Sequence, residues 1–100
     1  MKLWIDDVRP APEGYVWCKS VNEAKRYLYM SNPYITAEVE LVDIDHDAGD
    51  YAYDGGDYIK LLDWFEETGR NYPIRIHSQN IVGVQNMRRI IQKNGWKEVF

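Results

Sequence analysis

Short runs of apolar and β-branched residues alternate with longer amphipathic segments along this chain. The runs have the length of β-strands and lie at residues 3–5, 15–18, 39–45, 72–76 and 96–100. Between them, three segments repeat their apolar residues at helical spacing. The resulting order is strand, strand, helix, strand, helix, strand, helix, strand. It predicts an α/β domain with a mostly parallel five-stranded sheet and right-handed crossovers.

The first predicted helix has clear start and stop signals. Ser20 and Glu23 form a capping-box pair at its beginning. The helical spacing places an apolar face on Val21, Ala24, Tyr27 and Leu28. A turn at 31–33, which contains a proline, ends the helix near Met30.

The other two helices are bounded by polar residues and glycines. Asp57 is expected to open the second helix and Gly69 to close it. Asn80 is a candidate cap for the third helix, which should stop at Gly95. No helix fits between the first two strands, because the link at 9–14 is short and contains two prolines and a glycine.

The chain has the size and composition of one globular domain, residues 1–100. Hydrophobic residues make up 45% and aromatic residues 14%, which is enough for a packed core. The single cysteine, Cys18, excludes an internal disulfide. Asp6 and Asp7 end the first apolar run too early for a signal peptide, and no run is long enough to span a membrane. A cytoplasmic protein without membrane contact is expected.

Acidic residues are concentrated in one part of the chain. Eight of the 16 lie between Glu38 and Asp57, where there is no lysine or arginine. Such a segment is typical of a solvated loop, and it also suits a hard cation or a group that must hold a proton. Duplex DNA is not an expected partner, because no basic stripe is present.

Three of the predicted strands end in residues that can carry chemistry. These ends are Asp6-Asp7, Asp45-His46-Asp47 and His77-Ser78. In open α/β sheets, ligands bind beyond the carboxyl ends of the strands. Because neighbouring strands lie about 4.8 Å apart, these side chains are expected to converge on one cleft.

This arrangement resembles a receiver domain of two-component signalling, which implies a flavodoxin-like three-layer fold. The chain lacks two features of phosphoacceptor receivers: the helix between the first two strands, and a lysine at the end of the fifth strand. Four motifs instead resemble the cyclic-phosphate processing receiver domain family. They are IDDVRPAPEG, DIDHDAG, DGGDYIKLLDW and IHSQNIVGVQNM.

The resemblance implies an activity on cyclic phosphate ends or linkages, in the context of RNA repair. It assigns to the site Asp6, Asp7, Arg9, Asp45, His46, Asp47, His77, Ser78 and Asn80. The expected partner is a nucleotide or an RNA terminus.

The residues themselves permit a mechanism for opening a 2′,3′-cyclic phosphate. His46 and His77, the only histidines, can act as general base and acid, oriented by Asp45 or Asp47. The phosphate would be bound by Arg9, with Ser78 and Asn80 beside it. No cofactor is certain.

A metal-assisted version of this mechanism stays open. In it, Asp6, Asp7 and Asp45 hold Mg²⁺ or another divalent cation through oxygen ligands.

Two other classes of function are compatible with the same residues. The first is a signalling receiver phosphorylated on Asp45 with Mg²⁺ bound. The second is a non-catalytic module that binds a nucleotide or a protein. Sequence patterns do not decide whether the chain is an enzyme, nor do they determine its natural substrate or oligomeric state.

Overall fold

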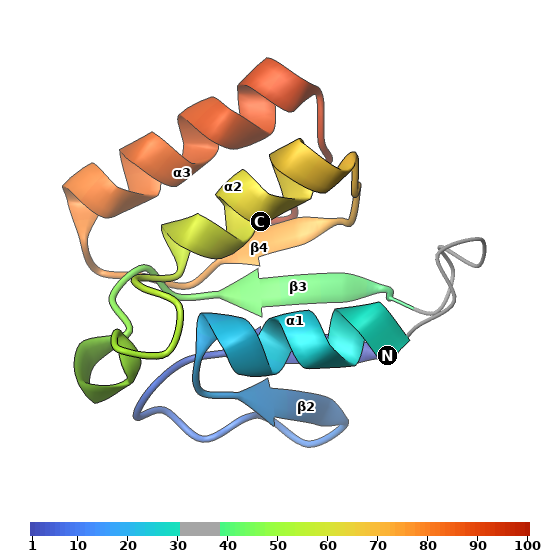
Figure 1. The fold of residues 1–100 in the computed structure, drawn as a ribbon. Helices are drawn as coiled ribbons and strands as arrows, with labels where there is room; N and C mark the ends of the chain where they lie inside the picture. Colours follow the sequence, from blue (N-terminus) through green and yellow to red (C-terminus); the bar gives the residue numbers. More distant parts are fainter. Residues whose placement is uncertain (31–38) are drawn as a thin grey trace.

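Four short strands form one parallel sheet in the computed structural model, which describes residues 1–30 and 39–100. The strands are β1 (Lys2–Ile5), β2 (Tyr15–Cys18), β3 (Leu41–Ile44) and β4 (Ile74–Ile76). Their order across the sheet is β2-β1-β3-β4, and all neighbours are parallel (Figure 1). The predicted α/β class, receiver-like and with a parallel sheet, is confirmed.

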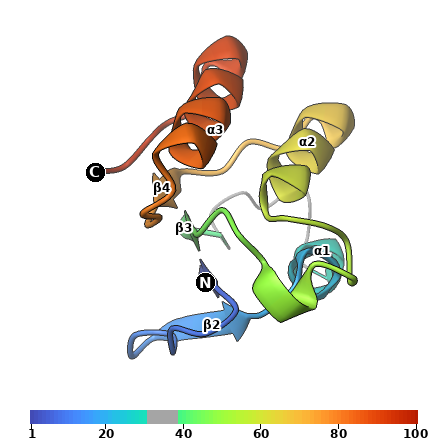
Figure 2. The same ribbon diagram turned by 90° about the vertical axis from the view of Figure 1, so that its left-hand side faces the viewer.

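Three α-helices connect and cover the described strands. They are α1 (Val21–Met30), α2 (Ile59–Thr68) and α3 (Ile81–Asn94); a 3₁₀ turn, η2 (Gly49–Tyr51), follows β3. Viewed from the carboxyl ends of the strands, α1 and α2 lie on one side of the sheet, with α3 beside α2 at the β4 edge (Figure 2). Among the described residues, no helix covers the opposite face. The described residues therefore form two layers, where the resemblance to receiver domains implied three.

The predicted fifth strand is reduced to a single bridge. Ile74 pairs in parallel with Glu98, and the flanking bonds run from the Ile74 amide to the Lys97 carbonyl (3.0 Å) and from the Val99 amide to the Ile74 carbonyl (2.7 Å). Because β4 is only three residues long, its outer edge offers few partners to the end of the chain. The described sheet therefore has four strands instead of five.

The core lies between the sheet and the helices. Leu3, Ile5, Val42, Ile44 and Ile74 point into it from the strands and are fully buried. They pack in one cluster with apolar residues of the helices, including Leu28, Leu61, Phe65 and Met87. Burying a side chain of this size contributes about 1.5–3 kcal/mol to folding. Successive strand residues point to opposite faces, so the alternate positions lie on the helix-free side.

The link between β1 and β2 contains no helix, as the sequence predicted. Its backbone is held by two indole groups of the strands that it joins. Trp4 Nε1 donates to the carbonyl of Arg9 (2.9 Å), and Trp17 Nε1 donates to the carbonyl of Asp6 (2.7 Å). These bonds hold a short, helix-free segment of bends and a turn that connects two adjacent parallel strands.

The start of α1 confirms one predicted cap and corrects one predicted burial. Ser20 Oγ accepts from the Glu23 amide at 3.0 Å, as the capping box requires. The Glu23 carboxylate reaches back to the amide of Lys19, one residue before the expected partner. Tyr27 was expected on the inner face but is 40% exposed. The turn predicted at 31–33 lies outside the described residues.

The ends of the other helices agree with the sequence except at one position. Asp57 was expected to cap α2, but the capping position belongs to Tyr58, and the Asp57 carboxylate accepts from the amide of Ala48 instead (3.0 Å). Gly69 and Gly95 end α2 and α3 in the left-handed conformation that favours glycine. Asn80 caps α3 by accepting from the Gly83 amide (2.9 Å), as predicted.

No helix in the described parts of the chain combines the length and the apolar character needed to cross a membrane.

Candidate functional site

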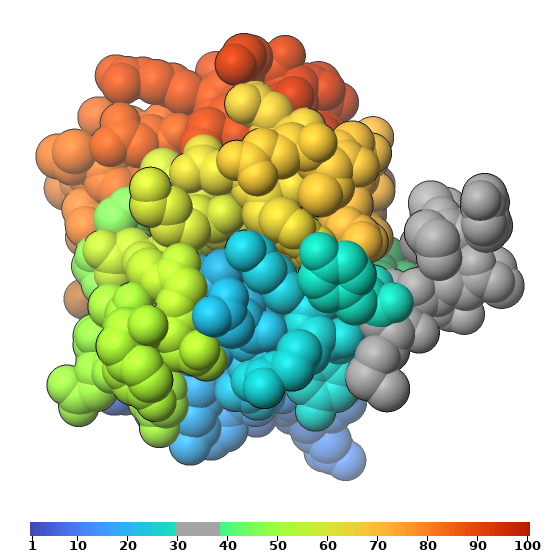
Figure 3. Space-filling model, in the orientation of Figure 1, coloured from blue at the N-terminus to red at the C-terminus, as the bar shows by residue number. Residues whose placement is uncertain are grey.

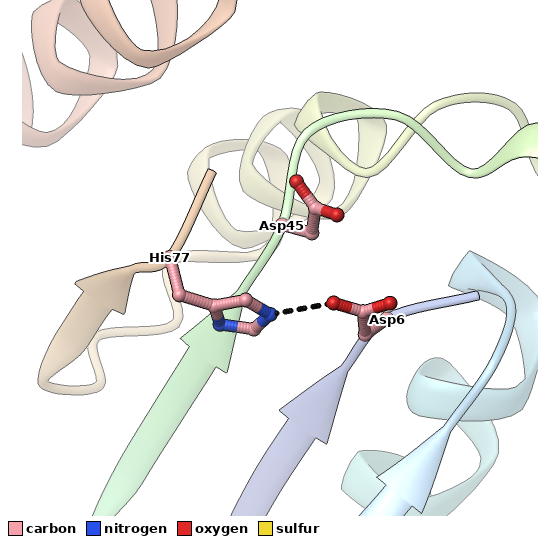
Figure 4. Close-up of side chains that lie close together, drawn as sticks. All are labelled: Asp6, Asp45 and His77. Atoms are coloured by element: carbon pink, nitrogen blue, oxygen red, sulfur yellow. Dashed lines mark hydrogen bonds and ion pairs between the residues drawn. The ribbon is translucent and has the colours of Figure 1, made fainter. Parts of the chain in front are cut away.

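Three neighbouring strands deliver ionisable side chains to one edge of the sheet. Asp6 follows β1, Asp45 follows β3 and His77 follows β4 (Figure 4). One potential ligand atom from each of these residues lies within 4.8 Å of the other two. The convergence expected from the strand ends is therefore present in the folded chain.

His77 is held between two buried carboxylates. Its Nε2 lies 2.9 Å from Asp6 Oδ2, and its Nδ1 lies 2.7 Å from Asp43 Oδ1. The side chains of Asp6 and Asp43 are 0% and 2% exposed. The imidazole also stacks on Trp4, with ring centroids 3.7 Å apart and planes 4° apart. Each ring nitrogen of His77 therefore lies within hydrogen-bond distance of a carboxylate oxygen, so a proton on either nitrogen has an acceptor.

The carboxylate of Asp6 is held in place by the backbone that follows it. Its Oδ1 accepts from the amides of Val8 (2.9 Å) and Arg9 (2.8 Å). Burial by itself raises the pKa of this carboxyl, but these amide bonds and the contact with His77 outweigh burial. The net pKa of Asp6 is lowered, so the group carries its charge at neutral pH.

Asp7 has the opposite electrostatic character. Burial raises its pKa, and the negative charges of Asp6 and Asp45 raise it further. Its carboxylate lies against the backbone of Gly49, where an added Cβ would collide with it. The two adjacent aspartates therefore differ: the pKa of Asp6 is lowered, whereas the pKa of Asp7 is raised.

His46 belongs to a second cluster at the same edge. Its Nδ1 lies 2.8 Å from Asp47 Oδ1, and Asn80 Nδ2 donates to both oxygens of that carboxylate at 3.2 and 3.3 Å. The hydrogen bond from His46 is the main reason that the pKa of Asp47 is lowered. Nε2 of His46 has no hydrogen-bond partner among the described residues. That nitrogen is available to a ligand.

A glycine of α3 makes room for the His46 ring. A Cβ on Gly83 would lie 2.5 Å from the ring atoms Cγ and Cδ2, which is much closer than a real contact. Gly83 is also the residue whose amide is capped by Asn80. The start of α3 therefore positions both His46 and its carboxylate partner.

The remaining predicted site residues are also placed near this edge. Arg9 is exposed, and its guanidinium has no partner in the part of the chain that the structure describes. Ser78 Oγ accepts from the Asn80 amide (3.2 Å). The side chain of Asn80 is engaged by Gly83 and Asp47, so it orients other groups.

Two sets of side chains can be compared with the ligand preferences of divalent cations. The structure groups Asp6 and Asp45 with His77, whereas the sequence led us to expect Asp7 as the third ligand. Three carboxylates suit Mg²⁺, while two carboxylates with an imidazole suit a transition metal. Asp6 and Asp45 belong to both sets, so these two carboxylates fit a cation of either kind.

Four residues of this site were not predicted from the sequence. Asp43 and Trp4 hold His77, while Gly49 and Gly83 give space to Asp7 and His46. Asp43 did leave a signal, because it is the one polar residue in the strand Leu41–Ile44. For the two glycines, no local pattern indicated which side chain would lie against them.

Comparison with known proteins identifies the chain at the level of a family. The model of the cyclic-phosphate processing receiver domain matches residues 1–93, which is almost the whole sequence. Searches of the curated proteins and of the solved structures gave no match.

Proposed function

Because the chain belongs to the family of cyclic-phosphate processing receiver domains, we propose that it is a phosphoesterase that opens cyclic phosphates. The proposed substrate is an RNA end with a 2′,3′-cyclic phosphate, or a related nucleotide, in RNA repair. One observation carries this proposal. Two histidines, His46 bonded to one carboxylate and His77 to two, lie at the same edge of the sheet as Arg9, whose guanidinium has no partner among the described residues.

The reaction needs one proton removed and one proton returned. Water attacks the phosphorus, the bond from phosphorus to one ribose oxygen breaks, and a phosphate monoester and a free hydroxyl result. A base takes a proton from the water, and an acid gives a proton to the leaving ribose oxygen. Positive charge is required beside the phosphate oxygens.

His46 is assigned the role of base. Asp47 accepts the Nδ1 proton at 2.8 Å, which leaves the lone pair of the neutral ring on Nε2. Among the described residues, Nε2 has no competing partner. Asn80 and Gly83 act through His46 and Asp47, so they are positioning residues.

His77 is assigned the role of acid. Its Nδ1 faces the buried Asp43, whereas its Nε2 faces Asp6 on the side where Asp45 lies. A proton on Nε2 can pass to the leaving oxygen, and the adjacent carboxylates stabilise the positively charged ring. Stacking on Trp4 keeps the ring plane fixed during this transfer.

Binding of the phosphate is assigned to Arg9 and Ser78. A guanidinium pairs with two phosphate oxygens at once, and the exposed Arg9 has no other partner among the described residues. If a divalent cation is bound, Asp6 and Asp45 would hold it, and Asp7 would be the third ligand as long as His77 acts as the acid. If His77 were the third ligand instead, its coordinating nitrogen could not also donate the proton. The cation would then add positive charge at the phosphate.

Turnover of a short RNA with a 2′,3′-cyclic phosphate end tests this proposal. The assay compares the unaltered chain with His46→Gln and His77→Gln, which keep a hydrogen-bonding group but cannot transfer a proton. Gln79→Ala serves as a control, because Gln79 is exposed in the same loop as His77. General acid–base catalysis contributes about 10²–10⁴-fold, so each histidine variant should lose activity in that range.

Each alternative outcome has a clear meaning. Full activity in both histidine variants would eliminate the histidine mechanism. Loss of activity in EDTA that is restored by one cation would select the metal-assisted version. If no turnover is seen under any condition, phosphorylation of Asp45 by a small phosphodonor would identify a signalling receiver instead. Nucleotide affinity without either reaction would identify a binding module.

A further inference from the structure

The face of the sheet opposite the helices is rich in aromatic and basic residues. The strand register places Trp4 beside Trp17, and Lys2 beside Tyr15 and Leu41, in two rows. Leu3, the residue between Lys2 and Trp4, is fully buried toward the helices, so both rows point to the other side. Arg75 extends the row of Trp4 onto β4. No described helix covers this face, which lies on the side of the sheet away from α1 and α2 in Figure 2.

The charges on this face differ in sign from those of the whole chain. The chain has a net charge of −4, yet Lys2 and Arg75 are exposed here. Asp43 is the one carboxylate among the strand residues of the two rows; it is 2% exposed and bonded to His77. An anionic ligand therefore suits this face, although the chain as a whole is acidic.

Cations and rings already contact each other on this face. The Lys2 ammonium lies 5.6 Å from the Tyr15 ring centroid, and the Lys19 ammonium lies 4.6 Å from that of Trp17. Tyr15, Trp4 and Trp17 are each partly exposed. Rings that offer a π-face beside basic groups are the elements with which proteins bind single-stranded nucleic acid. A four-stranded sheet with aromatic residues on neighbouring strands can stack about two or three bases.

The surface is continuous with the candidate site. Trp4 stacks directly on His77, and His77 bonds to Asp6. Along β1, the side chains on the helix-free face therefore lead from Lys2 to Trp4 and then to the carboxyl edge, where the phosphate chemistry is proposed.

We infer that the helix-free face of the sheet binds the single-stranded RNA that precedes the cyclic phosphate. This inference rests on the proposed function and specifies its substrate as a polynucleotide end rather than a free nucleotide. The terminal phosphate lies at the site, and the preceding nucleotides lie along β1. Their bases contact Tyr15 and the tryptophans, and Lys2 and Arg75 contact their phosphates.

The test separates binding from turnover. The probe is a short single-stranded RNA with a 3′-terminal phosphate and a fluorescent 5′ label, whose binding is followed by fluorescence anisotropy. A nucleoside 3′-monophosphate competes with it. We expect the RNA to bind at least tenfold more tightly than the mononucleotide, because each stacked base and each neutralised phosphate adds affinity.

Variants on the two sides of the sheet form matched pairs. Tyr15→Ala should weaken RNA binding about tenfold, and Tyr27→Ala, on α1, should have no effect. Lys2→Ala combined with Arg75→Ala should reduce the salt dependence of log Kd by about 0.7 for each phosphate that is no longer neutralised. Lys60→Ala on α2 is the charge control. Lys2 and Arg75 are exposed, so the double variant is expected to fold, and it tests the inference even if Tyr15→Ala does not fold.

The possible results distinguish this inference from the proposed function. RNA binding that depends on Tyr15, Lys2 and Arg75 supports the inference even if no cyclic phosphate is turned over. Turnover of a nucleoside 2′,3′-cyclic phosphate, with RNA bound no more tightly than the mononucleotide, overturns the inference and leaves the proposed function intact. Self-association that Tyr15→Ala abolishes, without RNA binding, would overturn it in favour of an interface between copies.

Discussion

At the scale of single residues, the site depends on which partner each ring and carboxylate has. His46 and His77 are chemically identical side chains, but the fold surrounds them differently. His77 has carboxylates at both ring nitrogens, whereas His46 has a carboxylate only at Nδ1 among the described residues. This difference is the physical basis for assigning them separate roles in proton transfer.

The contact between His46 and Gly83 leads to a prediction about one methyl group. Gly83→Ala improves intrinsic helix propensity by about 1 kcal/mol, but its Cβ would lie 2.5 Å from the His46 ring and must displace it. We expect cyclic phosphate turnover to fall by about tenfold or more while the chain remains folded. Kinetics measure the loss of turnover, and the NMR signals of the His46 ring report its displacement. Gln85→Ala, which lies exposed on the same helix, should change neither; unaltered ring signals in Gly83→Ala would contradict the assigned contact.

At the scale of elements, the segment that follows β3 is hydrogen-bonded to the start of α1. Ser20 Oγ donates to Asp54 Oδ2 (2.6 Å), and Asn22 Nδ2 donates to Asp54 Oδ1 (3.0 Å). Figure 3 shows the green segment packed against the blue beginning of α1. This segment begins with Asp45, His46 and Asp47, so the helix cap helps to fix the loop that carries site residues.

Loss of the Ser20 hydroxyl should therefore affect both the start of α1 and the loop that follows β3. Ser20→Ala removes the cap of α1 and leaves Asp54 without one of its donors, and it should lower the free energy of unfolding by about 1–2 kcal/mol. Urea unfolding measures this change. Thr68→Ala, at the exposed end of α2, should cost less than about 0.5 kcal/mol. Equal effects of the two substitutions would show that Ser20 does not link the two segments.

At the scale of the whole molecule, several carboxylates are gathered at one end of a small domain. Asp7 is partly buried beside Asp6 and Asp45, so its pKa is raised above the ordinary 3.8. A carboxyl whose pKa is higher in the folded state binds more protons folded than unfolded. Stability therefore falls as the pH rises from 3.8 through the folded pKa, and stays reduced above it.

Replacing this one charge should change the pH profile of stability. Asp7→Asn is expected to raise the urea midpoint at pH 7, and the gain should shrink as the pH falls through the raised folded pKa of Asp7 towards 3.8, because the native carboxyl becomes protonated. Asp50→Asn removes one exposed carboxylate from the acidic segment between Glu38 and Asp57, and it should leave the profile unchanged. A destabilised Asp7→Asn at pH 7 would indicate that the Asp7 charge is compensated, for example by a bound cation.

The sequence alone determined the elements and which residues end them. Strands such as Tyr15–Cys18 and the caps at Ser20, Asn80, Gly69 and Gly95 follow from local rules, because hydrogen bonds and backbone conformations within a few residues define them. The parallel sheet and the meeting of three strand ends also followed, since the order of elements restricts the topology. The catalytic and binding roles of the predicted site residues stay predictions.

Only the tertiary structure decided the pairings and the exposed surfaces. The bonds of His77 join residues that are 71 and 34 positions away in the chain, and the contact of Gly83 with His46 joins α3 to the loop after β3. The missing third layer and the shortened fifth strand depend on which faces and edges find partners in space. Such contacts are set by packing across the whole domain, and no local pattern of hydrophobic and polar residues encodes them.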